Sequence, residues 1–395
     1  MENEIDLIKG INKEINDKVV GFWHYFHENP ELSFNEKETS AFIAETLMHN
    51  NIEVHQGIGE NGLIGIIKGG NPGDSIGIRA ELDALPISEK TSLDFKSKHQ
   101  GVMHACGHDI HMASLLGTAL ILNKLKSELQ GNILLIFEQG EEQLPGGAMK
   151  IINSDIYKAY NPKVMIAFHI LPELAAGKSG FCEGQYMASG DEIYLVIKGK
   201  GGHAALPHST INPIILASKV ILDLKEFIDN ETPKEIPTIL SFGKINAEGA
   251  TNIIPNEVRI EGTFRTMDEK WRLAAHSMIE KIAKDTCKSM KGDCEIEIRK
   301  GYPSVFNSPD LTRKIKQLSV QYLGASNVVD LEKRMTTDDF AYFSQIIPSV
   351  FFRMGVGFEG IESYSLHNPS FIANGEVLKH SPGLMAWISI NLSNR

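Results

Sequence analysis

The chain has 395 residues, which is more than one average domain and enough to bury a large core. Its 42% hydrophobic and 23% charged residues are typical of a globular protein rather than a disordered or fibrous one. The formal net charge of −11 argues against a nucleic-acid partner, because phosphate backbones are bound by clustered lysines and arginines.

The sequence shows no pattern of membrane insertion or secretion. There is no apolar run of about 18 residues, so we expect no membrane partner. The first residues, Met-Glu-Asn-Glu-Ile-Asp, lack the basic and apolar regions of a signal peptide. The four cysteines are too sparse for a disulfide framework. We therefore expect a cytoplasmic protein.

The first part of the chain alternates helical and strand patterns. Helical spacing of apolar residues, short β-branched runs and one almost uninterrupted apolar run identify the elements. The predicted helices cover 4–28, 37–50 and 110–128, and the predicted strands cover 62–67, 75–80, 131–137 and 163–170. Three of these strands lead into or contain polar side chains, namely Asp83, the Glu141-Glu142 pair and His169. Ligand sites in open α/β sheets lie at such strand ends.

Residues 99–117 concentrate ligand-type side chains before the third helix. Only Gly107 separates Cys106 from His108, so a thiolate and an imidazole can converge on one point. The alternative is an ordinary helix N-terminus capped by Asp109. The density of histidines in this stretch favours a metal site.

The pattern of predicted strands and helices changes after about residue 186. Strands are predicted over 191–198, 237–245, 256–266 and 294–299, with helices over 211–229 and 269–290. This β-α-β-β-α-β order is that of ferredoxin-like α+β units. From about residue 303 the first pattern resumes, with a helix over 309–323, a strand over 349–354 and a closing helix near 374–393. We predict an α/β catalytic domain, 1–186 and 301–395, interrupted by a satellite domain, 187–300.

The paired carboxylates can divide the work of a hydrolase. One can ligate a metal while the other takes a proton from a water whose pKa a divalent metal lowers to about 7. A Glu-Glu pair is more often a solvated turn, but this pair follows a buried strand. Cys106, His108, Glu142, His169 and His367 make five candidate ligands, enough for two ions if one ligand bridges. Mixed thiolate, imidazole and carboxylate ligands suit Zn²⁺, Mn²⁺, Co²⁺ or Ni²⁺.

The predicted satellite carries a glycine-rich turn, 199–208, that presents His203. It lacks the ending of a phosphate-binding loop, whereas a histidine on a loop can donate to a developing oxyanion. Asn252 and Arg265 offer neutral and cationic donors for a substrate carboxylate. Structural roles for these two residues are equally open.

The chain resembles the M20 metallopeptidases, in the amidohydrolase branch of hippurate hydrolases, N-acyl-amino-acid deacylases and auxin-conjugate hydrolases. The matching segments are His24-Tyr-Phe-His-Glu-Asn-Pro-Glu-Leu-Ser33, Arg79-Ala-Glu-Leu-Asp-Ala-Leu-Pro86, Met103-His-Ala-Cys-Gly-His-Asp109, Glu141-Glu142, 199–208 and His367-Asn-Pro369. The Cys-Gly-His-Asp form is specific to this branch. At position 81 this chain has a glutamate, whereas an aspartate is frequent at that position in the branch.

This resemblance implies a zinc-peptidase-like catalytic domain, with a mixed sheet between helices, and a dimerisation lid. It implies Cys106 as the bridging ligand, His108 and His169 on one metal, and Glu142 and His367 on the other. By the same resemblance, the general base is Glu141, the aspartate that orients a neighbour is Asp83, and the oxyanion donor, reaching the partner subunit of a homodimer, is His203.

We therefore expect a dimetal amidohydrolase that cleaves N-acyl-L-amino acids. One rival is a dipeptidase or aminopeptidase with the same site, which would tolerate a free substrate α-amino group. Another is a non-catalytic protein that binds acyl-amino acids or metals. The second rival has no need for a positioned base such as Glu141.

Overall fold

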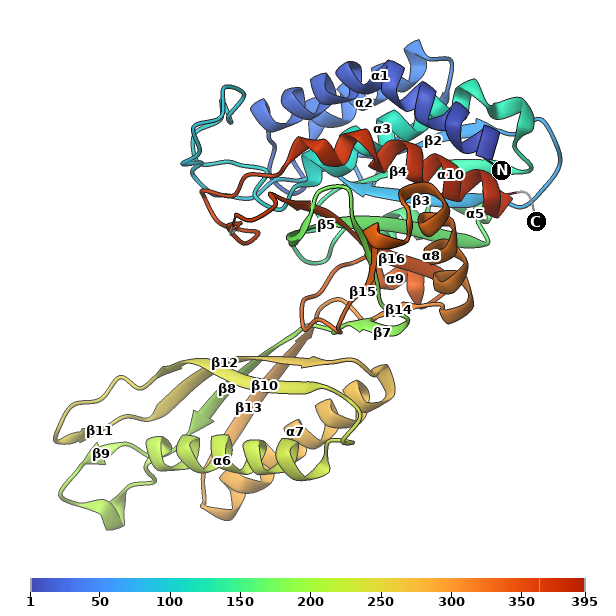
Figure 1. Ribbon diagram of the computed structural model, residues 1–395. Helices are drawn as coiled ribbons and strands as arrows, with labels where there is room; N and C mark the ends of the chain where they lie inside the picture. Colours follow the sequence, from blue (N-terminus) through green and yellow to red (C-terminus); the bar gives the residue numbers. More distant parts are fainter. Residues whose placement is uncertain (1, 362, 394–395) are drawn as a thin grey trace. The chain divides into compact units, whose positions relative to one another are not determined.

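The computed structural model describes residues 2–361 and 363–393, which form two compact units (Figure 1). The larger unit contains the chain up to Gly184, Phe306–Glu332, and the chain from Tyr342 onward. The smaller unit contains Gln185–Val305 and Lys333–Ala341. No helix among the described residues is long and apolar enough to cross a membrane.

The larger unit is built on an eight-stranded sheet with mixed strand directions, and a mixed sheet is what the family resemblance implied. In spatial order its strands are β1 (Glu53–Ile58), β2 (Gly62–Lys68), β4 (Asn132–Glu138), β3 (Ile76–Glu81), β5 (Val164–Ala175), β16 (Ser349–Gly357), β6 (Ser179–Phe181) and β15 (Val328–Asp330). The neighbours β4, β3, β5 and β16 are parallel. Their carboxyl ends therefore meet at one edge of the sheet.

Helices cover this sheet. They are α1 (Glu2–Glu28), α2 (Lys37–His49), α3 (His108–Lys124), α4 (Ala148–Asn153), α5 (Asp155–Tyr160), α8 (Pro309–Leu323), α9 (Ala341–Ser344) and α10 (Ser381–Ser393). α3 packs against α1, α10 and β3, and its side chains are buried from His108 to Leu122 (Figure 1). It is thus buried around its whole circumference, unlike a surface helix.

The predicted helices and the long strands are confirmed, with three differences. The helix predicted over 110–128 begins earlier, at His108, and ends in a separate 3-10 turn, Lys126–Glu128. The closing helix predicted near 374–393 is wrong as a single element, because the backbone leaves the helical conformation at His380 and separates a 3-10 turn, Gly375–Lys379, from α10. The short strands β1, β6 and β15 and the short helices α4, α5 and α9 were not predicted.

The smaller unit has the predicted element order. It consists of β8 (Asp191–Lys198), α6 (Pro213–Glu231), β10 (Thr238–Asn246), β12 (Glu257–Thr266), α7 (Glu269–Ser289) and β13 (Asp293–Lys300). The strands form an antiparallel sheet in the order β10-β12-β8-β13, and a separate apolar core joins it to both helices. A short ribbon of β9 (Gly202–His203) and β11 (Ile253–Ile254) extends from this unit.

The segment Lys333–Ala341 belongs to this smaller unit, although it lies within the part of the chain predicted as catalytic. The guanidinium Nη1 of Arg265 donates to the Met335 carbonyl at 2.8 Å, and the Ala188 amide donates to the Thr336 carbonyl at 3.1 Å. These contacts are made by backbone groups of a loop, which leave no periodic signal in the sequence. β7 (Gly184–Met187) and β14 (Val305–Asn307) lie where the chain passes between the units.

Candidate metal centre

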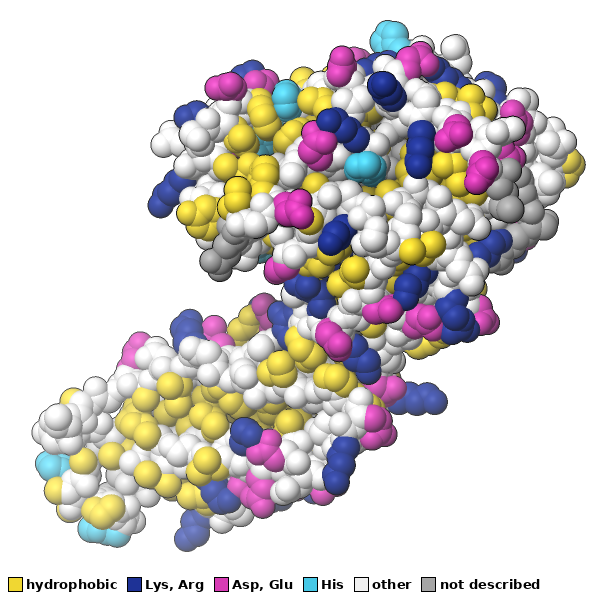
Figure 2. Space-filling model, in the orientation of Figure 1, with side chains coloured by type: hydrophobic (Ala, Val, Ile, Leu, Met, Phe, Trp, Pro, Cys, Tyr) yellow, Lys and Arg dark blue, Asp and Glu magenta, His cyan; other side chains and the backbone are white. Residues whose placement is uncertain are grey.

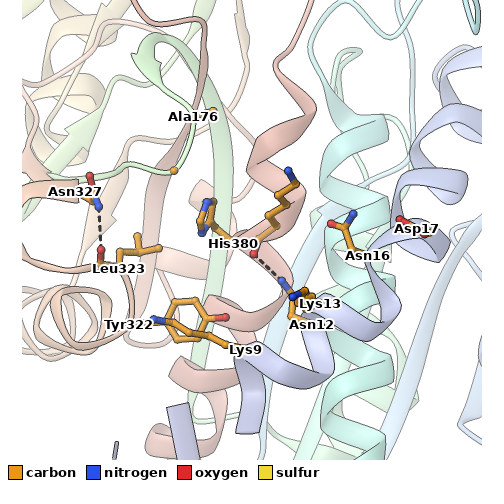
Figure 3. Close-up of a pocket in the computed structure, with 12 residues that line it drawn as sticks. Lys9, Asn12, Lys13, Asn16, Asp17, Ala176, Tyr322, Leu323, Asn327 and His380 are labelled. Carbon is orange, nitrogen blue, oxygen red and sulfur yellow. Dashed lines mark hydrogen bonds between the residues drawn. The ribbon is translucent and has the colours of Figure 1, made fainter. Parts of the chain in front are cut away.

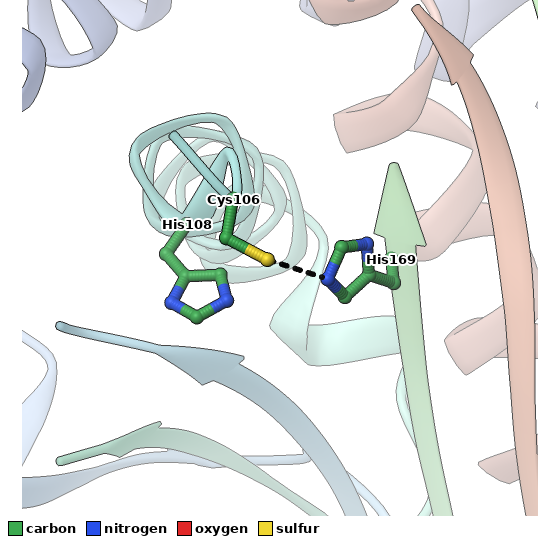
Figure 4. A group of neighbouring side chains, drawn as sticks. All are labelled: Cys106, His108 and His169. Atoms are coloured by element: carbon green, nitrogen blue, oxygen red, sulfur yellow. Dashed lines mark hydrogen bonds between the residues drawn. The ribbon is translucent and has the colours of Figure 1, made fainter. Parts of the chain in front are cut away.

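The structure brings the five candidate ligands together in the larger unit. Cys106 lies in the loop before α3, and His108 is the first residue of that helix. The Cys106 Sγ atom is 3.4 Å from Nε2 of His169, a residue of β5 (Figure 4). It is also 3.4 Å from Nε2 of His367, and this His367 atom is 3.2 Å from Oε1 of Glu142.

Cys106 is shared by two groups of three ligand atoms. One group joins it to His108 and His169, and the other joins it to Glu142 and His367; within each group all atoms lie within 4.8 Å of one another. Two ions held by these groups would have the thiolate in common. This is the bridging arrangement that the Cys-Gly-His-Asp resemblance implies for this chain.

The backbone at two positions is shaped to make this convergence possible. Gly107 has φ +82°, and a Cβ there would lie 2.0 Å from Cδ1 of Ile170. Only glycine combines this left-handed conformation with so close an approach. His367 is also left-handed, at φ +62°, and its amide donates to the Ala105 carbonyl at 2.9 Å. That bond ties the His367 loop to the segment that carries Cys106.

Asp83 orients two of the candidate ligands. Its Oδ1 lies 3.2 Å from Nδ1 of His108, and its Oδ2 accepts the backbone N–H of Glu142 at 2.9 Å. Ser33 donates its hydroxyl to the same Oδ2 at 2.7 Å. With Nδ1 of His108 held in this way, its buried Nε2 has no hydrogen-bond partner among the described residues. A carboxylate behind a histidine whose other nitrogen is unsatisfied is the usual support of a metal ligand.

The electrostatic setting favours a cation. Burial lowers the pKa of His108, but the carboxylates of Glu81 and Asp83 outweigh it and raise that pKa to about 10. Burial and the nearby Glu142 and Glu141 hold the pKa of the Cys106 thiol well above its usual value. Burial keeps the pKa of His169 well below its usual value, so its imidazole is neutral and offers a lone pair. These residues fit a divalent ion, which would neutralise the negative field and stabilise the thiolate.

Glu141 lies beside this cluster and is 7% exposed. Its carboxylate groups with His108 and Glu142, the three ligand-type atoms lying within 4.8 Å of one another. The preceding residue, Gly140, donates its amide to Oε1 of Glu36 at 2.8 Å. The backbone around both glutamates is therefore held in place. Glu36 accepts the amide that precedes Glu141, and Asp83 accepts the amide of Glu142.

A second group of buried charges lies behind the candidate ligands and was missed from the sequence. Arg79 donates to both Glu81 and Glu138, and the second contact is 3.0 Å long. Oε2 of Glu81 is 2.8 Å from Nδ1 of His111, whose Nε2 accepts the Ile170 amide at 3.0 Å. The signal was available, because Arg79 and Glu81 are charged residues within the fully buried strand β3.

The remaining predicted residues lie in the smaller unit. His203 is exposed on the short β9–β11 ribbon, and the amide of the next residue donates to the Asn252 carbonyl at 3.0 Å, so His203 and Asn252 are neighbours. Arg265 is half-buried near the opposite end of β12, and the structure does not group it with those two.

Comparison with known proteins places this geometry in a family. The sequence profile of peptidase family M20/M25/M40 matches residues 77–379. Thermostable carboxypeptidase 2 of Saccharolobus solfataricus is 34% identical over 99% of each chain, and the N-acetylcysteine deacetylase of Bacillus subtilis is 34% identical over 96% of this chain and 98% of its own.

Solved structures agree with the sequence relatives. The crystal structure of the Bacillus subtilis YXEP protein, described as a dinuclear metal binding peptidase from the M20 family, is 32% identical and matches with a TM-score of 0.84. The match covers 97% of this chain and 99% of that one. On its sequence and on its fold, this chain belongs to peptidase family M20/M25/M40.

Proposed function

We propose that this protein is a dimetal amidohydrolase that cleaves the amide bond of N-acyl-L-amino acids, giving a carboxylic acid and a free amino acid. The observation that carries the proposal is the double use of Cys106, which belongs to both ligand groups beside the buried carboxylate of Glu141. Substrates of this class include hippurate and N-acetyl amino acids. The four free cysteines suit a reducing compartment, and we place the enzyme in the cytoplasm.

The proposed ligands divide into two sets that share the thiolate. His108 and His169 would hold one ion, Glu142 and His367 the other, and Cys106 would bridge them. Zn²⁺, Mn²⁺, Co²⁺ and Ni²⁺ all accept such mixed ligands. When bound, two such ions polarise the amide carbonyl and lower the pKa of the attacking water.

Glu141 is the proposed proton carrier. Its carboxylate takes the proton of the water that attacks the amide carbon, and it later returns a proton to the nitrogen of the leaving amine. This role needs a base that is fixed in place and shielded from solvent. The 7% exposure of Glu141 and the backbone bond of Gly140 to Glu36 meet both needs. His203 would donate to the oxygen that becomes negative when the carbonyl is attacked.

We further propose that the smaller unit forms a homodimer interface and a lid. β10 is an edge strand, and beside it lies a groove of about 320 Å³. Its lining is mostly apolar, with two lysines, and comprises Ile221, Leu222, Lys225, Leu240, Phe242, Gly243, Lys244 and Ile245. Figure 2 shows hydrophobic side chains gathered on this unit, and Leu222 and Ile245 are 65% and 55% exposed. An exposed edge strand with apolar neighbours can pair with its own copy about a two-fold axis. His203 would then reach the partner's site.

Asn252 and Arg265 are the proposed contacts for the substrate carboxylate. The position of Asn252 beside His203 supports the first assignment. Arg265 has five donors, of which one nitrogen contacts the Met335 carbonyl, so further donors remain for a carboxylate.

Exchange of Glu141 for glutamine tests the chemistry. Because glutamine keeps the size of the side chain but cannot carry the proton, Glu141→Gln should retain both metals and lose turnover by about three orders of magnitude or more. The exposed Glu173 on β5 provides the matched control, since Glu173→Gln should leave turnover unchanged. Unchanged turnover in Glu141→Gln would overturn the mechanism.

A substrate panel separates the proposal from its rivals. Hippurate, N-acetyl-methionine, N-acetyl-diaminopimelate and Ala-Ala should be offered to enzyme loaded with Mn²⁺ and then with Zn²⁺. Metal-dependent cleavage of an acyl-amino acid with Ala-Ala spared supports the proposal. Cleavage of Ala-Ala alone indicates a dipeptidase, and metal binding without any turnover favours a binding protein. A carboxypeptidase would cleave the same kind of bond with a peptidyl group as the acyl part.

A further inference from the structure

The segment that precedes α2 reaches the loop that carries the paired glutamates. Within this segment Glu36 is 0% exposed, although glutamate is rarely buried so completely. Its Oε1 accepts the backbone amides of Phe34 at 2.9 Å and Gly140 at 2.8 Å, and its Oε2 accepts Nδ2 of Asn61 at 3.0 Å. One carboxyl group thus joins three segments that are separated in the sequence.

Gly140 is the point at which this contact acts on the loop. It has φ +68°, a left-handed conformation that favours glycine, and a Cβ there would lie 2.3 Å from Cε1 of Phe34. The turn at Gly140 is therefore closed from two sides, by the Phe34 ring and by the Glu36 carboxyl group. The next residue is Glu141, so this turn sets the direction in which the Glu141 side chain leaves the backbone.

Glu36 serves Gly140 as a hydrogen-bond acceptor rather than as a charge. Burial raises the pKa of Glu36 to about 7, and Asp83 acts in the same direction, while the hydrogen bonds from Phe34 and Asn61 lower it. At neutral pH the carboxyl group is therefore not fully ionised. A carboxyl oxygen accepts an amide hydrogen in either form, so the length of the side chain and the place of its oxygen decide the contact.

We propose that Glu36 is a positioning residue for the reaction, which fixes the turn at Gly140 and thereby holds the Glu141 carboxylate where the proton is transferred. The inference rests on the proposed function, in which Glu141 is the proton carrier. It separates the support of the two paired glutamates, because the Glu142 amide is held by Asp83 instead. Loss of the Glu36 contact should thus slow turnover while metal binding stays as it was.

Two conservative exchanges test this inference on the metal-loaded enzyme with N-acetyl-methionine. Glu36→Asp keeps the charge but is one methylene group shorter, which withdraws its oxygen from the Gly140 amide. Its kcat should fall about tenfold or more, with KM and metal affinity within about threefold of the wild type. Glu36→Gln keeps the length and an acceptor oxygen, so its kcat should stay within about threefold of the wild type. The matched control is Glu31→Asp, because Glu31 accepts the backbone amides of Glu38 and Thr39 at 3.3 and 2.8 Å, and it should keep its kcat.

Loss of stability alone has a different signature. Asn12 is 2% exposed and donates Nδ2 to the Lys379 carbonyl at 2.7 Å, beside the cavity shown in Figure 3. The lining of this cavity includes none of the five proposed ligands. Asn12→Ala should therefore lower the free energy of unfolding and leave the kcat of the metal-loaded enzyme unchanged.

A double-variant comparison shows whether Glu36 acts through Glu141. Glu36→Asp should slow the wild type but should slow Glu141→Gln no further, because the group that Glu36 positions is already gone. Unchanged kcat in Glu36→Asp, an equal loss in Glu36→Gln, or a full additional loss in the Glu141→Gln background would each overturn the inference. Failure of the proposed function is a separate result, since it appears as the absence of turnover in the wild type.

Discussion

At the scale of single residues, the five proposed ligands depend on side chains outside that set. His111 accepts the Ile170 amide with Nε2 and faces Glu81 with Nδ1, so it holds the strand segment next to His169. Arg79 neutralises Glu81 from the other side. These contacts join β3, α3 and β5, and their partners are far apart in the sequence. The ligand types could be predicted from a dense local motif, whereas this support depends on tertiary contacts.

Removal of His111 should therefore weaken metal binding without removing any of the five proposed ligands. We expect His111→Leu to lower metal affinity by about 10- to 100-fold, the usual effect of losing a partner that orients a ligand. Competition against a coloured chelator measures this affinity. The control is His55→Leu, since His55 is a half-exposed histidine of β1 whose imidazole hydrogen-bonds to the exposed Glu53, away from the candidate metal centre. Equal affinities for wild type and His111→Leu would contradict the assigned role.

A second residue-scale prediction concerns the pH dependence of stability. His27 is buried, with Nδ1 2.7 Å from Asp109 and Nε2 3.3 Å from Glu89. Burial lowers the pKa of His27, but these two carboxylates raise it to about 9 in the folded protein. Because this value exceeds the unfolded value of about 6.5, the stabilisation is complete below about pH 6.5 and is lost as pH rises towards 9.

The shift corresponds to a stabilisation on the order of 3 kcal/mol. Urea unfolding of wild type and His27→Gln at constant metal content should show the larger difference in free energy near pH 6 and a smaller one near pH 9.5. His49→Gln, at an exposed position of α2, should show no such trend. A difference that is the same at both pH values would mean that folding does not raise the pKa of His27.

At the scale of elements, the pattern of apolar residues predicted the long helices and strands that pack into the core. Long amphipathic or wholly apolar segments became α1, α3 and β4, because each buries a surface that its own sequence defines. Short strands such as β6 and β15 exist only through pairing with strands elsewhere in the chain, so their own residues carry no signal. The start of α3 at His108 is likewise set by the turn at Gly107.

Two glycines with the same backbone angle allow this turn to be tested. Gly101 and Gly107 both have φ +82°, but a Cβ at Gly101 meets nothing within 4 Å, whereas one at Gly107 meets Ile170 at 2.0 Å. Gly101→Ala should cost only the conformational strain, about 1 kcal/mol. Gly107→Ala should cost about 2–4 kcal/mol through added overlap, and it should also weaken metal binding. Denaturant unfolding after metal chelation, followed by metal titration, measures both. Equal losses of unfolding free energy in the two variants would show that the Ile170 side chain moves aside without cost.

At the scale of the whole molecule, the chain order revealed an insertion. The pattern of predicted elements changes near residue 186 and changes back near residue 303. Both points lie close to the ends of Gln185–Val305, the main segment of the smaller unit. The return of Lys333–Ala341 to the smaller unit could not be predicted, because loop backbone bonds hold it there. The oligomeric state cannot be predicted from the pattern of apolar residues either. An exposed apolar strand face has the same pattern whether or not a second copy covers it.

A mixing experiment tests the proposed dimer and the reach of His203 together. Glu141→Gln and His203→Ala should each be inactive as homodimers. In a mixed dimer, the subunit with an intact Glu141 would receive His203 from its partner, so one of the two sites would work. Equal amounts, unfolded and refolded together, form mixed dimers in about half of cases and should regain about a quarter of wild-type activity.

If His203 acts within its own chain, every subunit of the mixture carries one defect and no activity returns. The separate variants, refolded alone, are the controls for regained activity. Leu222→Glu in both chains tests the interface, because a charge on each side of a two-fold contact repels its copy. This variant should sediment as a monomer and abolish the recovery. A Leu222→Glu mixture that stays dimeric and still recovers activity would show that the subunits associate through another face.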